Sequence, residues 1–393
     1  MYLNIGIDIA KDAHEACILD DEGKQIGRYI QIKNLKSSIE KFIERVESVS
    51  NRLNSIPRIG MEATGIYWYA IYSELSKHYE IHAYNPSQVK GFAAVNIRGS
   101  KTDKIDAKTI AAILQFGEAP KTCYGDKKRM ELKEYCGFHF KLKSNVANLK
   151  KRLIRNVHLI FPRYDQMFSS IFTKTSIAIL NEVPRPSDML GMGEEKLYEF
   201  MKKTSRNHYS PEKTRKLLEM AKDSISPDFI EEALLFEVKS LLNLIEYMES
   251  QIKEVETRIL AAWETLKDKH YLQTIPGISD LMAAMIWAEL GDVENFQHPD
   301  QIVAFAGYDP KVKKSGNKEV ISGPNKRGSR LLRWVLGRAV VQAKMHNPVI
   351  KQYFMKKISE GKHYNTALCA AAKKMIRIIW SVEKNKKPFQ VPT

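Results

Sequence analysis

The stretch Leu3-Asn-Ile-Gly-Ile-Asp-Ile9 opens the chain and decides its fold. Its apolar residues alternate with Asn4, Gly6 and Asp8, which is the period of a half-buried β-strand. Asp8 therefore lies on the opposite face of this strand from the isoleucines. The pattern predicts a first strand that carries a carboxylate at its end.

The residues that follow predict a mixed sheet covered by helices. The turn signal Asp21-Glu22-Gly23 separates a second strand from a third, and helical spacing begins at Leu35. The expected order is three strands, helix, strand, helix, strand, helix, which suits an α/β layer architecture. The strands are expected near 3–9, 15–19, 29–32, 59–62 and 80–84, and the helices near 35–46, 66–76 and from 103 onward.

Length and charge narrow the class of protein. The chain has 393 residues, 44% of them hydrophobic, which is enough for two or three domains with buried cores. Its formal net charge is +16. Such a charge is compatible with general solubility or with anionic membranes, but a folded chain this basic favours a nucleic-acid partner.

Cysteine usage and hydropathy predict a cytoplasmic protein. The four cysteines are scattered, without the paired spacing of a zinc site, and are expected to be reduced. The chain opens directly into strand-like sequence rather than a signal segment. No run approaches the ~20 apolar residues of a membrane span, so no membrane partner is expected.

The middle of the chain predicts long helices. Two heptad positions stay apolar over four heptads, which favours a coiled coil that joins two subunits; the alternative is a long helix packed inside its own domain. We therefore divide the chain into residues 1–126, a helical and dimerisation region at 127–268, and a mainly helical domain at 269–393. The heptad residues are Leu234, Leu241, Met248, Val255 and Ala262 at one position and Val238, Ile245, Ile252 and Ile259 at the other.

Two segments of the last region predict contacts with phosphate. The segment from Leu272 to Asp280 resembles a helix-hairpin-helix, in which the Pro276-Gly277 turn offers backbone amides to a phosphate; an ordinary corner between helices is equally compatible. The segment from Lys311 to Arg330 carries seven Lys or Arg residues and one Glu, and its glycines predict a mobile basic loop. The expected contact residues there are Lys313, Lys314, Gly316, Lys326, Arg327 and Arg330.

Four carboxylates are candidates for a metal site. Asp8 and Glu62 end two predicted strands, and Asp103 and Asp106 share one face of a predicted helix. In this strand order they could converge at one sheet edge, and oxygen donors suit Mg²⁺ or Mn²⁺ in phosphodiester chemistry. Singly, each has a simpler explanation, as a turn acid or as a charge at a helix N-terminus.

Several short motifs resemble the DEDD transposases of the insertion-sequence 110 family. The N-terminal motifs are Ile5-Gly-Ile-Asp-Ile-Ala-Lys11, Gly60-Met-Glu-Ala-Thr-Gly65 and Lys101-Thr-Asp-Lys-Ile-Asp-Ala-Lys108. The C-terminal ones are Ile275-Pro-Gly-Ile278, Phe305-Ala-Gly-Tyr-Asp-Pro310, Ser315-Gly316 and Asn325-Lys-Arg-Gly-Ser329. Their order and separation make the match specific. Asn317 stands where a second glycine often follows Ser-Gly in the family.

The resemblance implies a prokaryotic recombinase that excises and inserts its own element. It implies a RuvC-like domain of the RNase H fold with Asp8, Glu62, Asp103 and Asp106 as metal ligands, and Ser315 as a nucleophile that forms a transient 5′-phosphoserine link. It further implies a structured non-coding RNA that pairs with donor and target DNA. The resemblance also implies dimers that assemble into a tetramer, in which one subunit's acidic domain meets another's serine domain.

Three other functions compete with this interpretation. A RuvC-like endonuclease or Holliday-junction resolvase would use the same carboxylates with water as nucleophile, and would need neither Ser315 nor RNA. An actin-like ATPase or sugar kinase would need a second sheet domain, against which the helical second half argues. A non-catalytic DNA-binding module would leave the acidic residues unexplained, because carboxylates without a metal repel phosphate.

Overall fold

A computed structural model of the chain describes residues 1–63, 65–84, 86–93, 102–117, 127–205, 208–315, 318–325 and 328–391. The chain divides into two compact units, Met1–Lys127 and Lys128–Thr393. Each unit has its own architecture and is described by itself.

The N-terminal unit is built on a five-stranded mixed sheet with the order β3-β2-β1-β4-β5. The central strand β1 (Tyr2–Asp8) pairs antiparallel with β2 (Ala13–Leu19) and parallel with β4 (Ile56–Glu62). The outer strands are β3 (Ile30–Lys33) and β5 (Glu80–Tyr84). The predicted mixed α/β sheet is confirmed.

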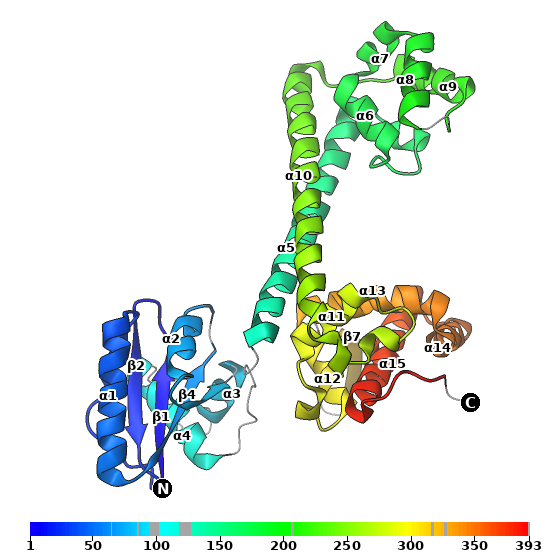
Figure 1. Ribbon diagram of the computed structural model, residues 1–393. Coiled ribbons are helices and arrows are strands. Elements are labelled where there is room, and N and C mark those ends of the chain that lie inside the picture. Colours follow the sequence, from blue (N-terminus) through cyan, green and yellow to red (C-terminus); the bar gives the residue numbers. More distant parts are fainter. Residues whose placement is uncertain are drawn as a thin grey trace. The chain divides into compact units, whose positions relative to one another are not determined.

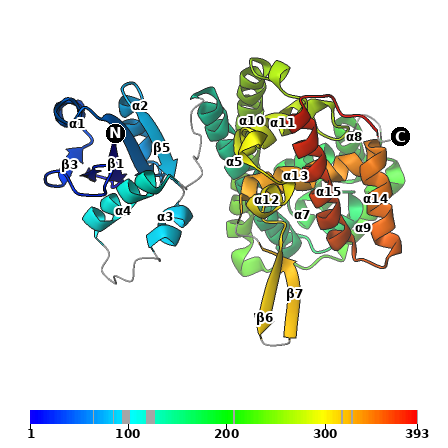
Figure 2. The ribbon, with the colours of Figure 1, turned by 90° about the horizontal axis from the view of Figure 1, so that it is seen from below.

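Helices cover both faces of this sheet. α1 (Lys36–Leu53) and α2 (Trp68–Leu75) lie on one face, and α4 (Asp103–Phe116) lies on the other beside α3 (Pro86–Ala93), which the sequence pattern did not predict (Figure 2). The isoleucines of β1 are fully buried, and Asn4 on the opposite face is buried as well, so helices cover this strand on both faces and it is not half-buried as the alternation predicts.

Two long antiparallel helices form a rod in the C-terminal unit. α5 (Lys127–Ile160) and α10 (Glu231–Glu264) lie side by side (Figure 1). Polar pairs tie them together at both ends, with His139 Nε2 2.8 Å from Glu256 Oε1 and Asn156 Nδ2 2.8 Å from Glu237 Oε2. The start of α5 thus lies beside the end of α10.

The predicted heptad pattern of α10 is present, but its partner is α5 of the same chain. Ile245 is 5% exposed within the single chain, and Leu241 and Ile252 are equally buried. This burial within one chain favours the alternative of a helix packed inside its own domain, and dimerisation through residues 127–268 stays a prediction. The pattern shows that an apolar stripe needs a partner helix, but not which chain supplies it.

Four short helices occupy the stretch from 161 to 227, about which the sequence said little. They cap the end of the rod that is formed by the end of α5 and the start of α10 (Figure 1). Arg185 forms ion pairs with Glu231 and Glu232 at the start of α10. The helices are α6 (Lys174–Glu182), α7 (Pro186–Met192), α8 (Glu194–Thr204) and α9 (Pro211–Lys222).

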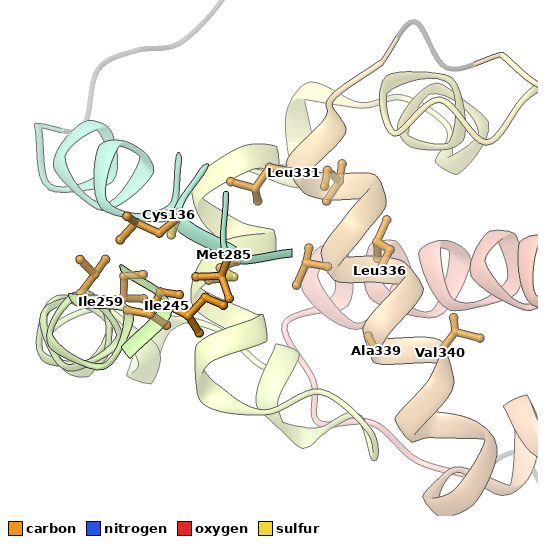
Figure 3. Close-up of a cluster of buried hydrophobic side chains, with 14 of the residues drawn as sticks. Cys136, Ile245, Ile259, Met285, Leu331, Leu336, Ala339 and Val340 are labelled. Atoms are coloured by element: carbon orange, nitrogen blue, oxygen red, sulfur yellow. The ribbon is translucent and has the colours of Figure 1, made fainter. Parts of the chain in front are cut away.

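At the other end of the rod, five helices form a body that shares its core with the rod. Figure 3 shows Cys136 of α5, Ile259 of α10 and Met285 of α11 in one buried cluster with residues of α13. The buried core runs without a break from the rod into these five helices, so the packing does not separate the chain at residue 268. A domain boundary at that residue stays a prediction. The helices are α11 (Asp280–Leu290), α12 (Pro299–Phe305), α13 (Arg330–His346), α14 (Pro348–Ser359) and α15 (Tyr364–Asn385).

A β-hairpin extends from this body, where a basic loop was predicted (Figure 2). It consists of β6 (Pro310–Ser315) and β7 (Lys318–Pro324). The missed signal is the dipeptide Gly316-Asn317 between two runs that contain β-branched residues, which is typical of a two-residue hairpin connection.

Within the described part of the chain, no helix is both long and apolar enough to cross a lipid bilayer.

Candidate active site and nucleic-acid interface

The strand register brings Asp8 and Glu62 together. β1 and β4 run parallel and pair Ile7 with Met61, so the next residue on each strand is one of the two carboxylates. Adjacent strands lie about 4.8 Å apart. The two acids therefore end neighbouring strands at the same edge of the sheet.

Two glycines show which face of the sheet these acids share. A Cβ atom added at Gly6 would lie 2.1 Å from the Ala107 carbonyl oxygen, and one at Gly60 would lie 3.0 Å from the side chains of Ile110 and Leu114. Helix α4 thus presses directly onto the face that carries both glycines. Because side chains alternate along a strand, Asp8 and Glu62, each two residues further on, lie on this α4-covered face.

The direction of α4 completes the convergence. Near the starts of the strands, Arg58 Nη2 donates to Asn4 Oδ1 at 2.7 Å and to the Leu114 carbonyl oxygen at 3.2 Å. Gly6, further along β1, contacts the earlier residue Ala107. The helix therefore runs opposite to β1 and β4, and its N-terminus lies toward their carboxyl ends.

Asp103 and Asp106 occupy this N-terminal turn of α4. Thr102 caps the helix, its hydroxyl accepting a hydrogen bond from the Ile105 amide at 3.4 Å. Two carboxylates in a first turn also interact favourably with the helix dipole. The backbone thus places all four predicted acids at one end of the sheet.

The four acids carry the oxygen donors that a hard divalent cation prefers. Asp103 is exposed, and the side chains of Asp8, Glu62 and Asp106 are half-buried, so all four remain accessible from solvent. Among the residues that the structure describes, no group of three or more His, Cys, Asp or Glu side chains is close enough to hold a metal ion. A metal centre here is thus consistent with the backbone placement but is not assembled by the side chains.

The loop after β1 is fixed by residues that the sequence analysis did not single out. His14 Nδ1 accepts a hydrogen bond from the Ala10 amide at 3.2 Å, and its Nε2 lies 2.8 Å from Asn34 Oδ1. Asn34 also donates to the Lys11 carbonyl at 2.8 Å. Burial lowers the pKa of His14, which favours the neutral ring that this pairing needs. From the sequence alone, a single histidine in a strand cannot be recognised as the residue that holds a neighbouring loop in place.

Ser315 is the last residue of β6 and pairs with Lys318 across the hairpin. Lys313 pairs with Val320, and Lys314 pairs with Glu319. Three other residues that were predicted to contact nucleic acid lie outside the described residues; they are Gly316, Lys326 and Arg327.

The base of the hairpin is firmly anchored. The Ser329 amide donates to the Phe305 carbonyl at 2.7 Å, and its hydroxyl donates to Glu289 Oε2 at 2.6 Å. A Cβ atom at Gly328 would lie 2.1 Å from the Phe305 carbonyl oxygen, so only glycine fits there. The motifs at 305–310 and 325–329 thus join at this base, and Arg330 follows as an exposed residue at the start of α13.

The Pro276-Gly277 turn has a packing role of its own. Gly277 has φ of 100°, and a Cβ atom there would lie 2.5 Å from the Ala343 backbone of α13. The element before the turn is a three-residue 3₁₀ helix at Leu272–Thr274. The close approach to α13 accounts for the glycine, and phosphate binding by a helix-hairpin-helix stays a prediction.

The rod has one basic helix and one acidic helix. α5 contains no Asp or Glu between Tyr135 and Ile160, whereas α10 carries eight glutamates. A polyanion would therefore be attracted along α5, which carries a basic surface that the sequence pattern had not been taken to predict. The exposed cations of this stretch are Lys141, Lys151, Arg152 and Arg155.

Comparison with known families identifies the class of protein. Residues 5–162 match the model of the IS110-type DEDD transposase domain, described as a transposase, and residues 269–355 match a domain described as the transposase IS116/IS110/IS902 family. The first match contains the four acids, and the second contains the hairpin and its base. The chain therefore belongs to the IS110 family of transposases.

Relatives align along nearly the whole chain. The transposase for insertion sequence element IS1111A of Coxiella burnetii is 24% identical over 98% of this chain and 91% of its own length. The pilin gene-inverting protein of Moraxella lacunata is 23% identical over 98% of this chain and 97% of its own. An uncharacterized 42 kDa protein of insertion element IS900 from Mycobacterium paratuberculosis is 21% identical over 99% and 97%.

Proposed function

We propose that the protein is a recombinase that cuts and rejoins DNA strands to excise and insert an insertion sequence. The observation that carries this proposal is the convergence of Asp8, Glu62 and the N-terminus of α4 at one end of the sheet. Membership of the transposase family supports it, and so does a relative named for inverting a gene. A RuvC-like, RNase H-type fold is proposed for the N-terminal unit on the same grounds.

Asp8, Glu62, Asp103 and Asp106 would hold Mg²⁺ or Mn²⁺. When bound, these ions would stabilise negative charge on the oxygens of the scissile phosphate. The chain's own contribution is the placement of four carboxylates on a strand–strand–helix frame that fixes their backbone positions. That frame leaves the acids accessible to DNA.

Ser315 is the proposed nucleophile. Its Oγ would form a bond to the scissile phosphorus while the bond from phosphorus to the 3′-oxygen breaks. The serine proton passes to solvent water, and the departing 3′-oxygen takes up a proton from water to become a hydroxyl, so no proton is consumed overall. The 5′-phosphoserine that results keeps the phosphodiester bond energy for rejoining. Ser315 stands at the end of β6 with lysines on either side of it in the sequence, and this position favours contact with a phosphate backbone.

A structured RNA is the proposed guide, pairing with donor and target DNA. Guided systems leave sequence recognition to base pairing while the protein holds the backbone. The net charge of +16 and the basic face of α5 support such a role.

A tetramer is proposed as the active assembly. Because most of the heptad residues are buried within one chain, the contacts between subunits are proposed to use other surfaces.

An arrested reaction tests the nucleophile. On DNA with a built-in strand break, the wild type should leave a phosphodeoxynucleotide on the peptide that contains Ser315, as detected by mass spectrometry. Ser315→Ala should bind DNA and leave none, while Ser250→Ala, at an exposed position on α10, should behave as wild type. Strand cleavage that persists in Ser315→Ala without any adduct would favour the hydrolytic nuclease instead.

Co-purifying nucleic acid tests the guide. Purification at moderate salt should yield one dominant RNA encoded beside the gene, and ribonuclease treatment should abolish recombination. A heterogeneous mixture of cellular RNA, together with full activity after ribonuclease, would contradict RNA guidance.

A further inference from the structure

A pocket of about 630 Å³ opens where α5, α10 and α13 meet. One wall is aromatic, with the rings of Phe140 and Trp334 5.6 Å apart between centroids and inclined at 65°. The guanidinium of Arg338 lies 5.1 Å from the centroid of the Trp334 ring. The pocket contains none of the four acids and no residue of the hairpin.

The rim of this pocket carries an excess of positive charge. Lys143 pairs with Glu256 at 3.2 Å, and Lys150 pairs with Glu249 at 2.6 Å. Two further cations, Lys253 and Arg338, are exposed and form no ion pair with a carboxylate in the described part of the chain. An aromatic wall with unpaired cations beside it suits a planar ring next to a negative charge.

We propose that this pocket binds one unpaired nucleotide, with its base stacked against Trp334 and its phosphate near Lys253 and Arg338. A cavity of this size lies within the range of about 300–1,000 Å³ typical of small-molecule sites, which excludes a duplex but accepts one base that has left its stack. Unpaired bases in loops and bulges are commonly held by aromatic rings and arginine planes. The inference rests on the proposed nucleic-acid partner, but not on the acids or on Ser315.

The surroundings of the pocket fit a continuing strand. Ala147, which lines the pocket, is followed on the same face of α5 by the exposed Lys151 and Arg155, at successive intervals of four residues. Phosphates on one side of the bound nucleotide could therefore follow the basic face of α5. An acidic peptide would pair with the same cations but would leave the aromatic wall uncovered.

Hairpin oligonucleotides with and without a single-nucleotide bulge test this inference. The wild type should bind the bulged hairpin more tightly than the fully paired one. Trp334→Leu should remove that preference, a loss on the order of ten- to one-hundred-fold for the bulged hairpin, and should leave the paired hairpin unaffected. Trp334→Phe, which keeps a ring, should retain most of the preference.

Two further variants separate binding from folding. Arg338→Ala changes an exposed side chain and should weaken the bulged hairpin selectively, so the inference does not depend on Trp334→Leu alone. Tyr247→Leu replaces an aromatic residue that is 64% exposed on the same rod and should change nothing. Melting temperatures of all variants should stay close to the wild type.

The outcomes discriminate clearly. If the wild type prefers the bulged over the paired hairpin only when both are RNA, the bound nucleotide belongs to a guide RNA. If it shows this preference only when both are DNA, the nucleotide belongs to a cleaved DNA strand. Equal binding of bulged and paired hairpins by the wild type, or a preference that survives in folded Trp334→Leu and Arg338→Ala, overturns the pocket while the proposed recombinase stands. Failure to bind any hairpin overturns both.

Discussion

The two units hold their candidate functional groups in different ways. In the N-terminal unit, four acids lie on buried strands and on a helix that is pressed against them through glycines, so their positions depend on close packing. In the C-terminal unit, Ser315 ends a strand of a hairpin that is anchored at its base. A packing change in the first unit should therefore move several functional groups at once, whereas a change at Ser315 should leave its fold intact.

The largest expected effect is on activity, in the N-terminal unit. Glu62→Gln or Asp106→Asn removes an anionic ligand with almost no change in size, so fold and DNA binding should persist. Recombination should fall on the order of a hundredfold or more, because metal ligation supplies several kcal/mol of charge stabilisation. Rates on a two-site plasmid would measure this. Glu44→Gln, an exposed control on α1, should recombine normally, and a wild-type rate for Asp106→Asn would remove that residue from the site.

The rod should respond through stability rather than assembly. Ile245→Glu places a charge in the interface between α5 and α10, at a cost of several kcal/mol. The melting temperature should fall sharply in circular dichroism, while Tyr247→Glu, two residues away and 64% exposed, should melt like the wild type. If light scattering showed a smaller particle with an unchanged melting temperature, the heptad residues would join subunits after all.

Gly6 tests the packing of α4 directly. Gly6→Ala must push α4 away from β1, because its Cβ would lie 2.1 Å from the Ala107 carbonyl oxygen. We expect a loss of about 1–3 kcal/mol in unfolding free energy, measured in denaturant, together with reduced recombination as the acids move apart. Gly91→Ala, in α3 with no atom within 4 Å, should be neutral or slightly stabilising. Equal stability of the two variants would contradict the close contact.

The smallest effect is a pH dependence in the rod. Burial lowers the pKa of His139 below its ordinary value of 6.5, although its hydrogen bond to Glu256 acts in the opposite direction. Below pH 6.5 the unfolded chain then binds more protons than the folded chain, so stability is present above this pH and is lost as the pH falls. Denaturant unfolding of His139→Gln should show a weaker decline than the wild type between pH 7 and pH 5. Identical slopes would show that His139 does not contribute.

The sequence predicted the N-terminal unit better than the C-terminal one, for physical reasons. Alternation and strand order placed Asp8 and Glu62 at strand ends, because the apolar residues of β1 alternate with small or polar residues even though both faces of the strand are buried. The heptads of α10 were recognised, but their partner was not, since an apolar stripe looks the same whether α5 or another chain covers it. The aromatic pocket could not be predicted, because Phe140 and Trp334 are far apart in sequence and meet only in the folded unit.

Binding of Mn²⁺ tests the central claim most directly, because it requires neither DNA nor RNA. Calorimetric titration of the full-length wild type should show a carboxylate-dependent site. Asp8→Asn should weaken that site strongly, whereas Ser315→Ala, in the other unit, should leave it unchanged. Equal Mn²⁺ binding by the wild type and Asp8→Asn would contradict the assignment of these acids as a metal site.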